Sequence, residues 1–198
     1  MTDPEAFEEL YKSGNTPWEL NRVDSNLVNI LNKRNIKNCS VLDVGCGIGT
    51  CSVWLAAGGY RVTGVDVSKT AIRQARANAR EKGVSAAFHS CNFLRDTVKG
   101  GPFDFLFDRG CFHSFDSDEE RTRFAKNASI HLKQKGLWFC IAGSSDDQRE
   151  TKGPPKLSAA EIVTAVEPFF KIQFIAAGLM DSSRKPAPGA WICLMQSR

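Results

Sequence analysis

The sequence lacks any run that approaches the roughly 18 consecutive apolar residues of a membrane-spanning helix, so we expect no contact with a membrane. We expect no signal peptide, because the first residues, MTDPEAFEEL, are acidic where such a peptide is basic and then apolar. A strong charge imbalance is missing too, since 26 basic side chains stand against 22 acidic ones. This mild excess does not indicate a polyanionic partner. We therefore expect a cytoplasmic protein that does not bind nucleic acid.

The seven cysteines lack the spacings that give cysteine a structural role. They form no CxxC pair and no cluster with histidine, so we expect neither a metal site nor a disulfide framework. Reduced thiols are typical of the cytoplasm. Internal repeats, low-complexity tracts and an interdomain linker are also missing. A chain of 198 residues is long enough for one domain with a full core.

What the sequence does contain is an apolar run followed by glycines at residues 41–51, VLDVGCGIGTC. Residues 40–44 have the length and β-branched content of a buried parallel strand. The glycines that follow allow a sharp turn and the close approach of a ligand. A helix is expected from Thr50 to the stop at Gly58, with one apolar face made by Val53, Trp54 and Ala57.

This order of strand, glycine turn and helix predicts a cradle for a nucleotide-type ligand. Free N–H groups of the first helical turn would face the ligand, together with the positive end of the helix dipole. A second strand, residues 60–66, ends in Asp66, 21 residues after Gly45. An acid about 20 residues after the first glycine is typical of a carboxylate that binds a ribose. The alternatives are a glycine turn without a ligand and an acid that caps the helix at Ser68.

The rest of the chain alternates between helices and strands. We expect helices at residues 4–11, 24–35, 68–82, 117–135 and 158–167, with capping boxes at Ser117 with Glu120 and Ser158 with Glu161. Further strands are expected at residues 85–89, 103–108, 137–142, 169–179 and 190–195. The link between the last two has no helical pattern, which favours an antiparallel hairpin.

These elements predict one Rossmann-like, doubly wound α/β domain. Its seven-stranded sheet is mostly parallel, its last strand is antiparallel, and helices cover both faces. Residues 1–36 are expected to form an N-terminal helical lid, in which Thr2 or Asp3 caps the first helix, and residues 37–198 the sheet domain.

The glycine spacing separates two kinds of cofactor. A dinucleotide fingerprint has glycines at its first, third and sixth positions, whereas counting from Gly45 the sixth residue is Thr50. The motif VLDVGCGIG, Asp66 within VTGVDVS, Asn92 before Phe93 and the reversed final strand instead resemble the class I S-adenosylmethionine-dependent methyltransferases. The resemblance covers residues 40–198. Asn92 departs from the aspartate common in that family, so its amide would meet the adenine edge through different hydrogen bonds.

Shorter motifs are similar to the thiopurine S-methyltransferase family and its bacterial relatives that methylate small molecules. They are Asp108-Arg109-Gly110 after the fourth strand, Gly153-Pro154-Pro155, and Trp18 after Pro17 in the lid. The Asn/Asp-Pro-Pro-aromatic signature of methyltransferases that act on nucleobases or glutamine is absent, which argues against a nucleic-acid substrate.

The resemblance implies a set of residues that bind S-adenosylmethionine and its product, S-adenosylhomocysteine. Asp43 is expected to shape the glycine turn and hold the methionine end, and Asp66 the ribose. The full set is Trp18, Asp43, Gly45, Cys46, Gly47, Gly49, Asp66, Val67, Asn92, Phe93 and Asp108.

Arg109 and His113 are the candidate catalytic residues. A thiol that is already ionised needs no general base, whereas a hydroxyl or a protonated amine would make His113 the candidate base. His113 could equally be structural. Arg109 either pairs with an anionic substrate group, steadies the lid, or forms a salt bridge with Asp108 or Asp116. Direct in-line transfer needs no covalent enzyme intermediate, so Cys111 is interpreted as a small pocket or core residue.

We therefore expect a monomeric or homodimeric enzyme that methylates a small molecule at a thiol, another soft nucleophile or a hydroxyl. Two alternatives stay open: an NAD(P)-dependent oxidoreductase, and a cofactor-binding protein that has lost its chemistry.

Overall fold

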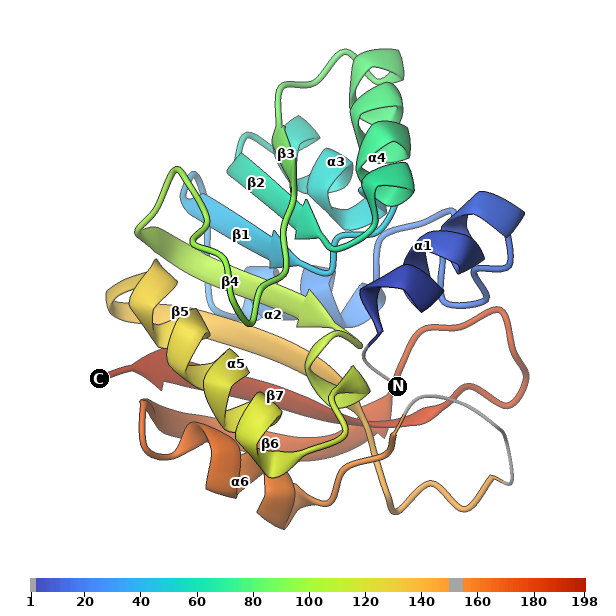
Figure 1. Cartoon of the computed structure of the whole chain (residues 1–198). Coiled ribbons are helices and arrows are strands. Elements are labelled where there is room, and N and C mark those ends of the chain that lie inside the picture. Colours follow the sequence, from blue (N-terminus) through green and yellow to red (C-terminus); the bar gives the residue numbers. More distant parts are fainter. Residues whose placement is uncertain (1–2, 150–154) are drawn as a thin grey trace.

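The computed structural model describes residues 3–149 and 155–198, and a central sheet runs through it (Figure 1). The strands are β1 (Ser40–Val44), β2 (Arg61–Asp66), β3 (Ala87–Ser90), β4 (Phe103–Arg109), β5 (Leu132–Gly143), β6 (Phe170–Leu179) and β7 (Gly189–Ser197). The helices are α1 (Pro4–Ser13), α2 (Ser25–Lys33), α3 (Thr50–Ala57), α4 (Lys69–Glu81), α5 (Asp118–His131) and α6 (Ala159–Val166), and η1 (Phe112–Ser114) is a 3₁₀ turn.

The strand order is β3-β2-β1-β4-β5-β7-β6. The first five strands in this order pair in parallel, and β7 runs antiparallel to both β5 and β6. The helix-free link between β6 and β7 forms the predicted hairpin, since antiparallel neighbours need no crossover helix. The predicted fold class is confirmed.

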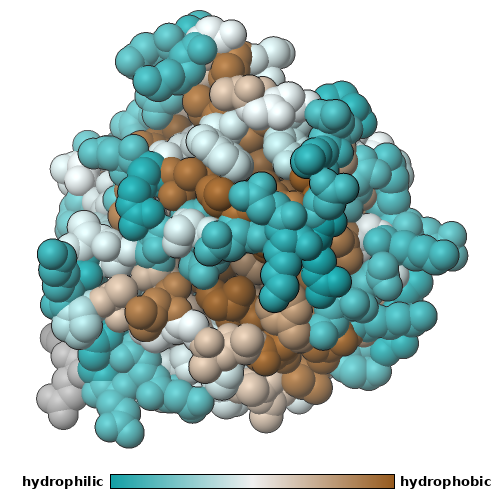
Figure 2. All heavy atoms as spheres, turned by 180° about the vertical axis from the view of Figure 1, so that it is seen from behind, coloured by the Kyte–Doolittle hydropathy of each residue, from teal (hydrophilic) through white to brown (hydrophobic). Residues whose placement is uncertain are grey.

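Both faces of the sheet are apolar, which is why its central strands have continuous hydrophobic sequences. On one face Leu106 and Trp138 pack under α5 and α6, and on the other Phe105 packs under α2. The part of the α2 face formed by β6 and β7 carries the partly buried Phe174 and Ile192. Figure 2, seen from behind, shows apolar side chains across the middle of this face with hydrophilic ones around them.

Helix capping follows the sequence closely. The Asp3 side chain accepts a hydrogen bond from the Glu5 N–H, and Ser68 does the same for the Ala71 N–H. Ser158 and Glu161 form the complete capping box. Ser117 accepts from the Glu120 N–H. Three residues that entered the predictions, Thr2, Gly153 and Pro154, lie outside the described residues.

Two predictions about helices are wrong. Helix α5 ends at His131 rather than near residue 135, because Leu132 is extended and pairs with Phe103 of β4. In α3 the buried residues are Ser52, Val53 and Leu55, whereas Trp54 is exposed. This short helix is packed between β2 and α4, so its buried side chains do not follow a single stripe.

The N-terminal segment divides into two parts. Helix α2 buries Leu27, Ile30 and Leu31 against the sheet and belongs to its core. Helix α1 instead lies beside the start of α4, near the carboxyl ends of β1, β2 and β4 (Figure 1). Only the part of the chain before α2 is therefore placed as a cover over that edge, where parallel sheets bind their ligands.

Candidate functional site

The turn after β1 is built from three glycines in the left-handed region, with φ of +69° at Gly45, +54° at Gly47 and +80° at Gly49. A Cβ atom at Gly47 would lie 2.1 Å from Glu19 Oε1, and one at Gly49 would lie 2.9 Å from Ala75 Cβ. Gly47 is therefore needed for the approach of the N-terminal segment, and Gly49 for the packing of α4.

The backbone N–H groups of this turn, from Gly45 to Gly49, are paired within the protein. Those of Gly45 and Cys46 donate to the Val65 carbonyl, and that of Gly49 to the Cys46 carbonyl. The Gly47 N–H donates to Asp66 Oδ2 at 3.0 Å, and the Ile48 N–H donates to Glu19 Oε1 at 3.1 Å. Two carboxylates thus occupy the positions where an anionic ligand would bind.

Asp66 ends β2, as the spacing predicts, and is buried. Its second oxygen, Oδ1, accepts from the Ser68 N–H at 2.9 Å, so the same residue holds both the glycine turn and the start of α4. Burial raises the pKa of Asp66 to about 6, although its two backbone hydrogen bonds oppose this shift.

Two further acids, the buried Asp43 and the half-buried Glu19, lie near the glycine turn. Burial raises the pKa of Asp43 to about 7, while a 2.6 Å hydrogen bond from the Ser52 hydroxyl acts in the opposite direction. Burial also raises the pKa of Glu19. Asp43 and Glu19 border a small cavity of about 50 Å³ next to Gly45 and Cys46. An acidic pocket of this kind favours a ligand that brings positive charge.

The N-terminal segment is fixed over the turn by a chain of hydrogen bonds. The Trp18 indole N–H donates to the Tyr11 hydroxyl at 3.0 Å, and that hydroxyl donates to Glu19 Oε1 at 2.9 Å. Trp18 also packs edge-on against Phe7 and Tyr11.

A second attachment of this segment is Glu8 in α1. Its carboxylate accepts from the Ser68 hydroxyl at 2.6 Å, from the Thr70 N–H at 3.0 Å and from the Thr70 hydroxyl at 2.7 Å. The Ser68 hydrogen bond and those of Thr70 lower the pKa of Glu8 to about 2. The ionised carboxylate thus sits at the N-terminus of α4, where the helix dipole favours it.

Arg109 also holds the N-terminal segment in place. Its Nε donates to Asp24 Oδ2 at 2.8 Å, its Nη1 to the Trp18 carbonyl at 3.0 Å, and its Nη2 to the Asp181 carbonyl. The guanidinium therefore joins the N-terminal segment to the β6–β7 loop. Of the roles considered for Arg109, this geometry matches the support of the lid.

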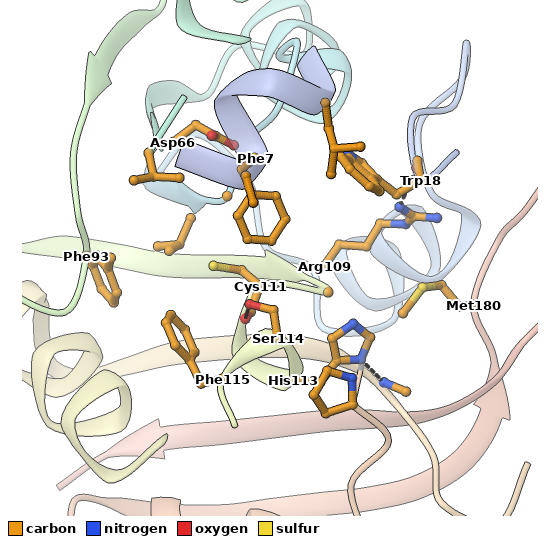
Figure 3. Close-up of a pocket in the computed structure, with 18 of the residues that line it drawn as sticks. Phe7, Trp18, Asp66, Phe93, Arg109, Cys111, His113, Ser114, Phe115 and Met180 are labelled. Atoms are coloured by element: carbon orange, nitrogen blue, oxygen red, sulfur yellow. Dashed lines mark hydrogen bonds between the residues drawn. The ribbon is translucent and has the colours of Figure 1, made fainter. Parts of the chain in front are cut away.

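A cavity of about 670 Å³ runs along this edge of the sheet (Figure 3). One half is bordered by Asp66, Val67, Asn92 and Phe93, at the ends of β2 and β3. The other half is bordered mainly by side chains beyond β4 and from the β6–β7 loop, namely Cys111, His113, Ser114, Phe115 and Met180. The two halves are continuous, so two ligands can meet inside the cavity.

His113 is buried in the wall of the second half, and its Nδ1 accepts a hydrogen bond from the Gly143 N–H (Figure 3). Burial, with a smaller effect of Arg109, lowers its pKa to about 4. Burial raises the pKa of the neighbouring Cys111 thiol well above its usual range, so this thiol stays protonated at neutral pH.

Most of the predicted site residues are brought together. Trp18, Gly45, Asp66, Val67, Asn92, Phe93, Arg109 and His113 line the large cavity, and Asp43 and Cys46 line the small one. Gly47, Gly49 and Asp108 line neither. Asp108 is fully buried and accepts hydrogen bonds from the Cys111 and Phe112 N–H groups, so it organises the η1 turn instead of facing a ligand.

Tyr11, Glu8 and Glu19 were missed from the sequence. Glu19 directly follows Trp18, and that position was the only available signal. Among the described residues, no group of three metal-ligating side chains is present, and no helix has the length and apolar content to cross a membrane.

Comparison with known proteins agrees with this geometry. Residues 41–136 match the model of a methyltransferase domain family. A ubiquinone biosynthesis O-methyltransferase of Rickettsia conorii is 34% identical over 104 residues, which are 52% of this chain and 34% of that protein. The chain spans 34–42% of the length of this and two similar Rickettsia relatives. A protein of Arabidopsis thaliana named "Probable thiol methyltransferase 2" is 25% identical over 187 residues, covering 92% of this chain and 79% of its own.

Two solved structures share the fold over nearly the whole chain. One, from work on the conversion of a disulfide bond into a thioacetal group during echinomycin biosynthesis, has a TM-score of 0.85 at 24% identity and covers 98% of this chain and 91% of its own. The other, 1,6-didemethyltoxoflavin-N1-methyltransferase of Burkholderia thailandensis, has a TM-score of 0.77 at 18% identity and covers 98% and 86%.

The fold and the crevice at the carboxyl ends of its strands define a Rossmann-like domain of the nucleotide-binding type. Within that class, the match of residues 41–136 to a methyltransferase domain family and the shared architecture agree with the class I S-adenosylmethionine-dependent methyltransferases that the motifs resemble.

Proposed function

We propose that the protein transfers a methyl group from S-adenosylmethionine to the sulfur of a small-molecule thiol. The observation that carries the proposal is the continuous cavity, acidic beside the glycine turn and without an available base beside His113. When bound, the sulfonium cofactor supplies an electrophilic methyl group with a neutral thioether as leaving group.

The acidic half fits this cofactor better than a dinucleotide. In the large cavity Asp66 would accept hydrogen bonds from a ribose diol, and from the adjoining small cavity Asp43 and Glu19 would attract the positive charges of a sulfonium and an ammonium group. A dinucleotide would bring a pyrophosphate to a turn whose Gly47 and Ile48 N–H groups already bind carboxylates. This contrast favours S-adenosylmethionine over NAD(P).

The half of the cavity beside His113 offers few groups that could remove a proton from the acceptor. Cys111 is a neutral thiol, Nδ1 of His113 already accepts a hydrogen bond, and the carboxylate of Asp147 is paired with Arg149. The acceptor must then enter in a nucleophilic form. A thiol of pKa about 8.5 supplies a few per cent of thiolate at pH 7, whereas an alcohol supplies almost none.

The comparisons with known proteins also support a sulfur acceptor. The O-methyltransferase relatives match only about half of this chain. Two of the matches that extend over nearly all of it, the Arabidopsis thiol methyltransferase and the structure from echinomycin biosynthesis, have names that refer to sulfur chemistry.

Calorimetry and a substrate panel test the proposal. We expect S-adenosylmethionine and S-adenosylhomocysteine to bind with measurable heat and NAD not to compete. We expect thiophenol to be methylated and phenol at the same concentration not to be. Absence of binding by both sulfur compounds would overturn the cofactor assignment. Binding without turnover of any thiol, phenol or amine would favour a protein that only binds the cofactor.

A further inference from the structure

The position of the proton on His113 follows from its surroundings. The Gly143 backbone N–H can only donate, so the Nδ1 atom that it contacts must be unprotonated. A neutral imidazole then carries its proton on Nε2. A Cβ atom at residue 143 would lie 2.8 Å from Nδ1, so a glycine is needed there for this contact.

The ring has little reason to become charged. It is 5% exposed, and the charged group that acts on it is the Arg109 guanidinium, which lowers its pKa further. From β5 and the segment after it, Asp147, Arg149 and Lys156 face the same cavity. The Asp147 carboxylate is held by Arg149, and Lys156 donates to two backbone carbonyls. From the β6–β7 loop, the carboxylate of Asp181 pairs with Arg22, and Arg184 adds positive charge.

Nε2 has no hydrogen-bond partner among the described residues, and it points into the cavity (Figure 3). A Cβ atom at Gly110 would lie 3.4 Å from Nε2, so this side of the ring is bordered by backbone without a side chain. The cavity wall therefore presents one buried N–H group near Cys111 and Phe115, on the acceptor side.

We propose that the Nε2–H group of His113 donates a hydrogen bond to the ionised acceptor atom, and that it selects acceptors which enter as thiolates over neutral alcohols. This inference rests on the proposed methyl transfer to sulfur. It assigns His113 the role of a fixed donor and not that of the general base considered from the sequence. A hydrogen bond to a charged acceptor is stronger than one to a neutral atom, so it stabilises the thiolate over the thiol.

The step balances without a base on the protein. The thiol gives its proton to the solvent before transfer. An electron pair of the thiolate then forms the new sulfur–carbon bond while the methyl–sulfonium bond breaks, and the pair of the broken bond remains on the departing thioether. His113 keeps its proton throughout.

The pH dependence of thiophenol methylation tests this role in the full-length protein. In the wild type, the apparent pKa on the acid side of the kcat profile reports the bound thiol, and that of the kcat/KM profile reports the free thiol. The first should be lower than the second. In His113→Ala, the apparent pKa of the kcat profile should rise to that of the kcat/KM profile. At pH 6 kcat should fall about 10-fold, with a change of less than about 3-fold at pH 9, where the thiol is ionised without help.

His113→Gln supplies the rescue, because its side-chain amide N–H can replace Nε2–H. We expect it to recover most of the rate at pH 6, and His89→Gln, an exposed histidine on β3, to leave the profile unchanged. Thermal melting and S-adenosylhomocysteine binding verify that each variant is folded.

Three results would overturn the assignment. The first is equal apparent pKa values of kcat and kcat/KM in the wild type. The second is a His113→Ala variant in which the apparent pKa of kcat does not change. The third is an equal loss of rate at pH 6 and pH 9 that His113→Gln does not restore. Failure of the wild type to methylate any thiol would instead reject the proposed function, and the two failures are therefore distinguishable.

Discussion

The half of the cavity beside Asp66 and the half beside His113 differ in what their polar groups do. Beside the first, the buried Asp66 and the half-buried Glu19 bind the backbone of the glycine turn and carry raised pKa values. In the second, the buried histidine is neutral and presents a single N–H group. On the function proposed above, the first half would hold a cation with a ribose, and the second a soft nucleophile that arrives ionised. The chemistry of transfer is thus divided between two ligands, and the protein mainly positions them.

The largest expected effect comes from Asp66→Asn. Loss of the charged acceptor should weaken S-adenosylhomocysteine binding by about 30- to 100-fold in calorimetry, as expected for a hydrogen bond to a charged group. Asp104→Asn, at the opposite end of the strands, removes a carboxylate that pairs with Lys133 and should leave the affinity unchanged. Equal affinities of the two variants for S-adenosylhomocysteine would contradict the claim that the half of the cavity beside Asp66 binds the cofactor.

A smaller loss is expected from Gly47→Ala, because its methyl group would lie 2.1 Å from the Glu19 carboxylate and displace it. We expect roughly 10-fold weaker binding, caused by loss of the ordered lid. Gly83→Ala is the matched control: its φ is also positive, +64°, but nothing lies within 4 Å of the added Cβ. It should cost about 1 kcal/mol of stability and leave binding intact. Identical binding in both variants would remove the role of Glu19.

The buried acid beneath the turn gives a pH signature. The folded-state pKa of Asp43, about 7, lies above its ordinary value, so its contribution favours folding at low pH and is lost as the pH rises through 7. Asp43→Asn should therefore stabilise the ligand-free protein at pH 8, by on the order of 2 kcal/mol in urea unfolding, less at pH 5, and hardly at all below its ordinary pKa of 3.8. The same change should weaken cofactor binding. A variant that is less stable than the wild type at pH 8 would show that the folded protein does not disfavour the charged form of Asp43.

The smallest effect concerns the lid attachment. The pKa of Glu8 is lowered to about 2, so its contribution is present above pH 4.5 and is lost as the pH falls toward 2. Because this carboxylate is partly exposed, Glu8→Gln should cost at most about 1 kcal/mol at pH 7. Glu9→Gln, which removes only a surface pair with Lys12, serves as the control. Hydrogen exchange of α1 should increase in Glu8→Gln alone, and equal exchange in both would contradict the attachment.

The parts of the site that the sequence predicts well are local. The strand before Gly45, the helix from Thr50 and the position of Asp66 each depend on residues close in the chain, and the structure contains them as expected. The end of α5 was placed wrongly because Leu132 pairs with Phe103, a partner far away in the sequence.

The finer features of the site depend on contacts across long stretches of chain. Glu19 reaches Ile48 across 29 residues, and Gly143 fixes the proton of His113 across 30. No spacing or periodicity encodes these contacts, so the carboxylates bound at the glycine turn and the surroundings of His113 could be found only in three dimensions.

A crystal structure with S-adenosylhomocysteine and an aromatic thiol tests the central claim most directly. The account predicts the ribose hydroxyls within hydrogen-bond distance of Asp66, and the thiol sulfur facing Nε2 of His113. Density for the cofactor product outside this cavity, or a thiol bound away from His113 with its sulfur against another group, would contradict it.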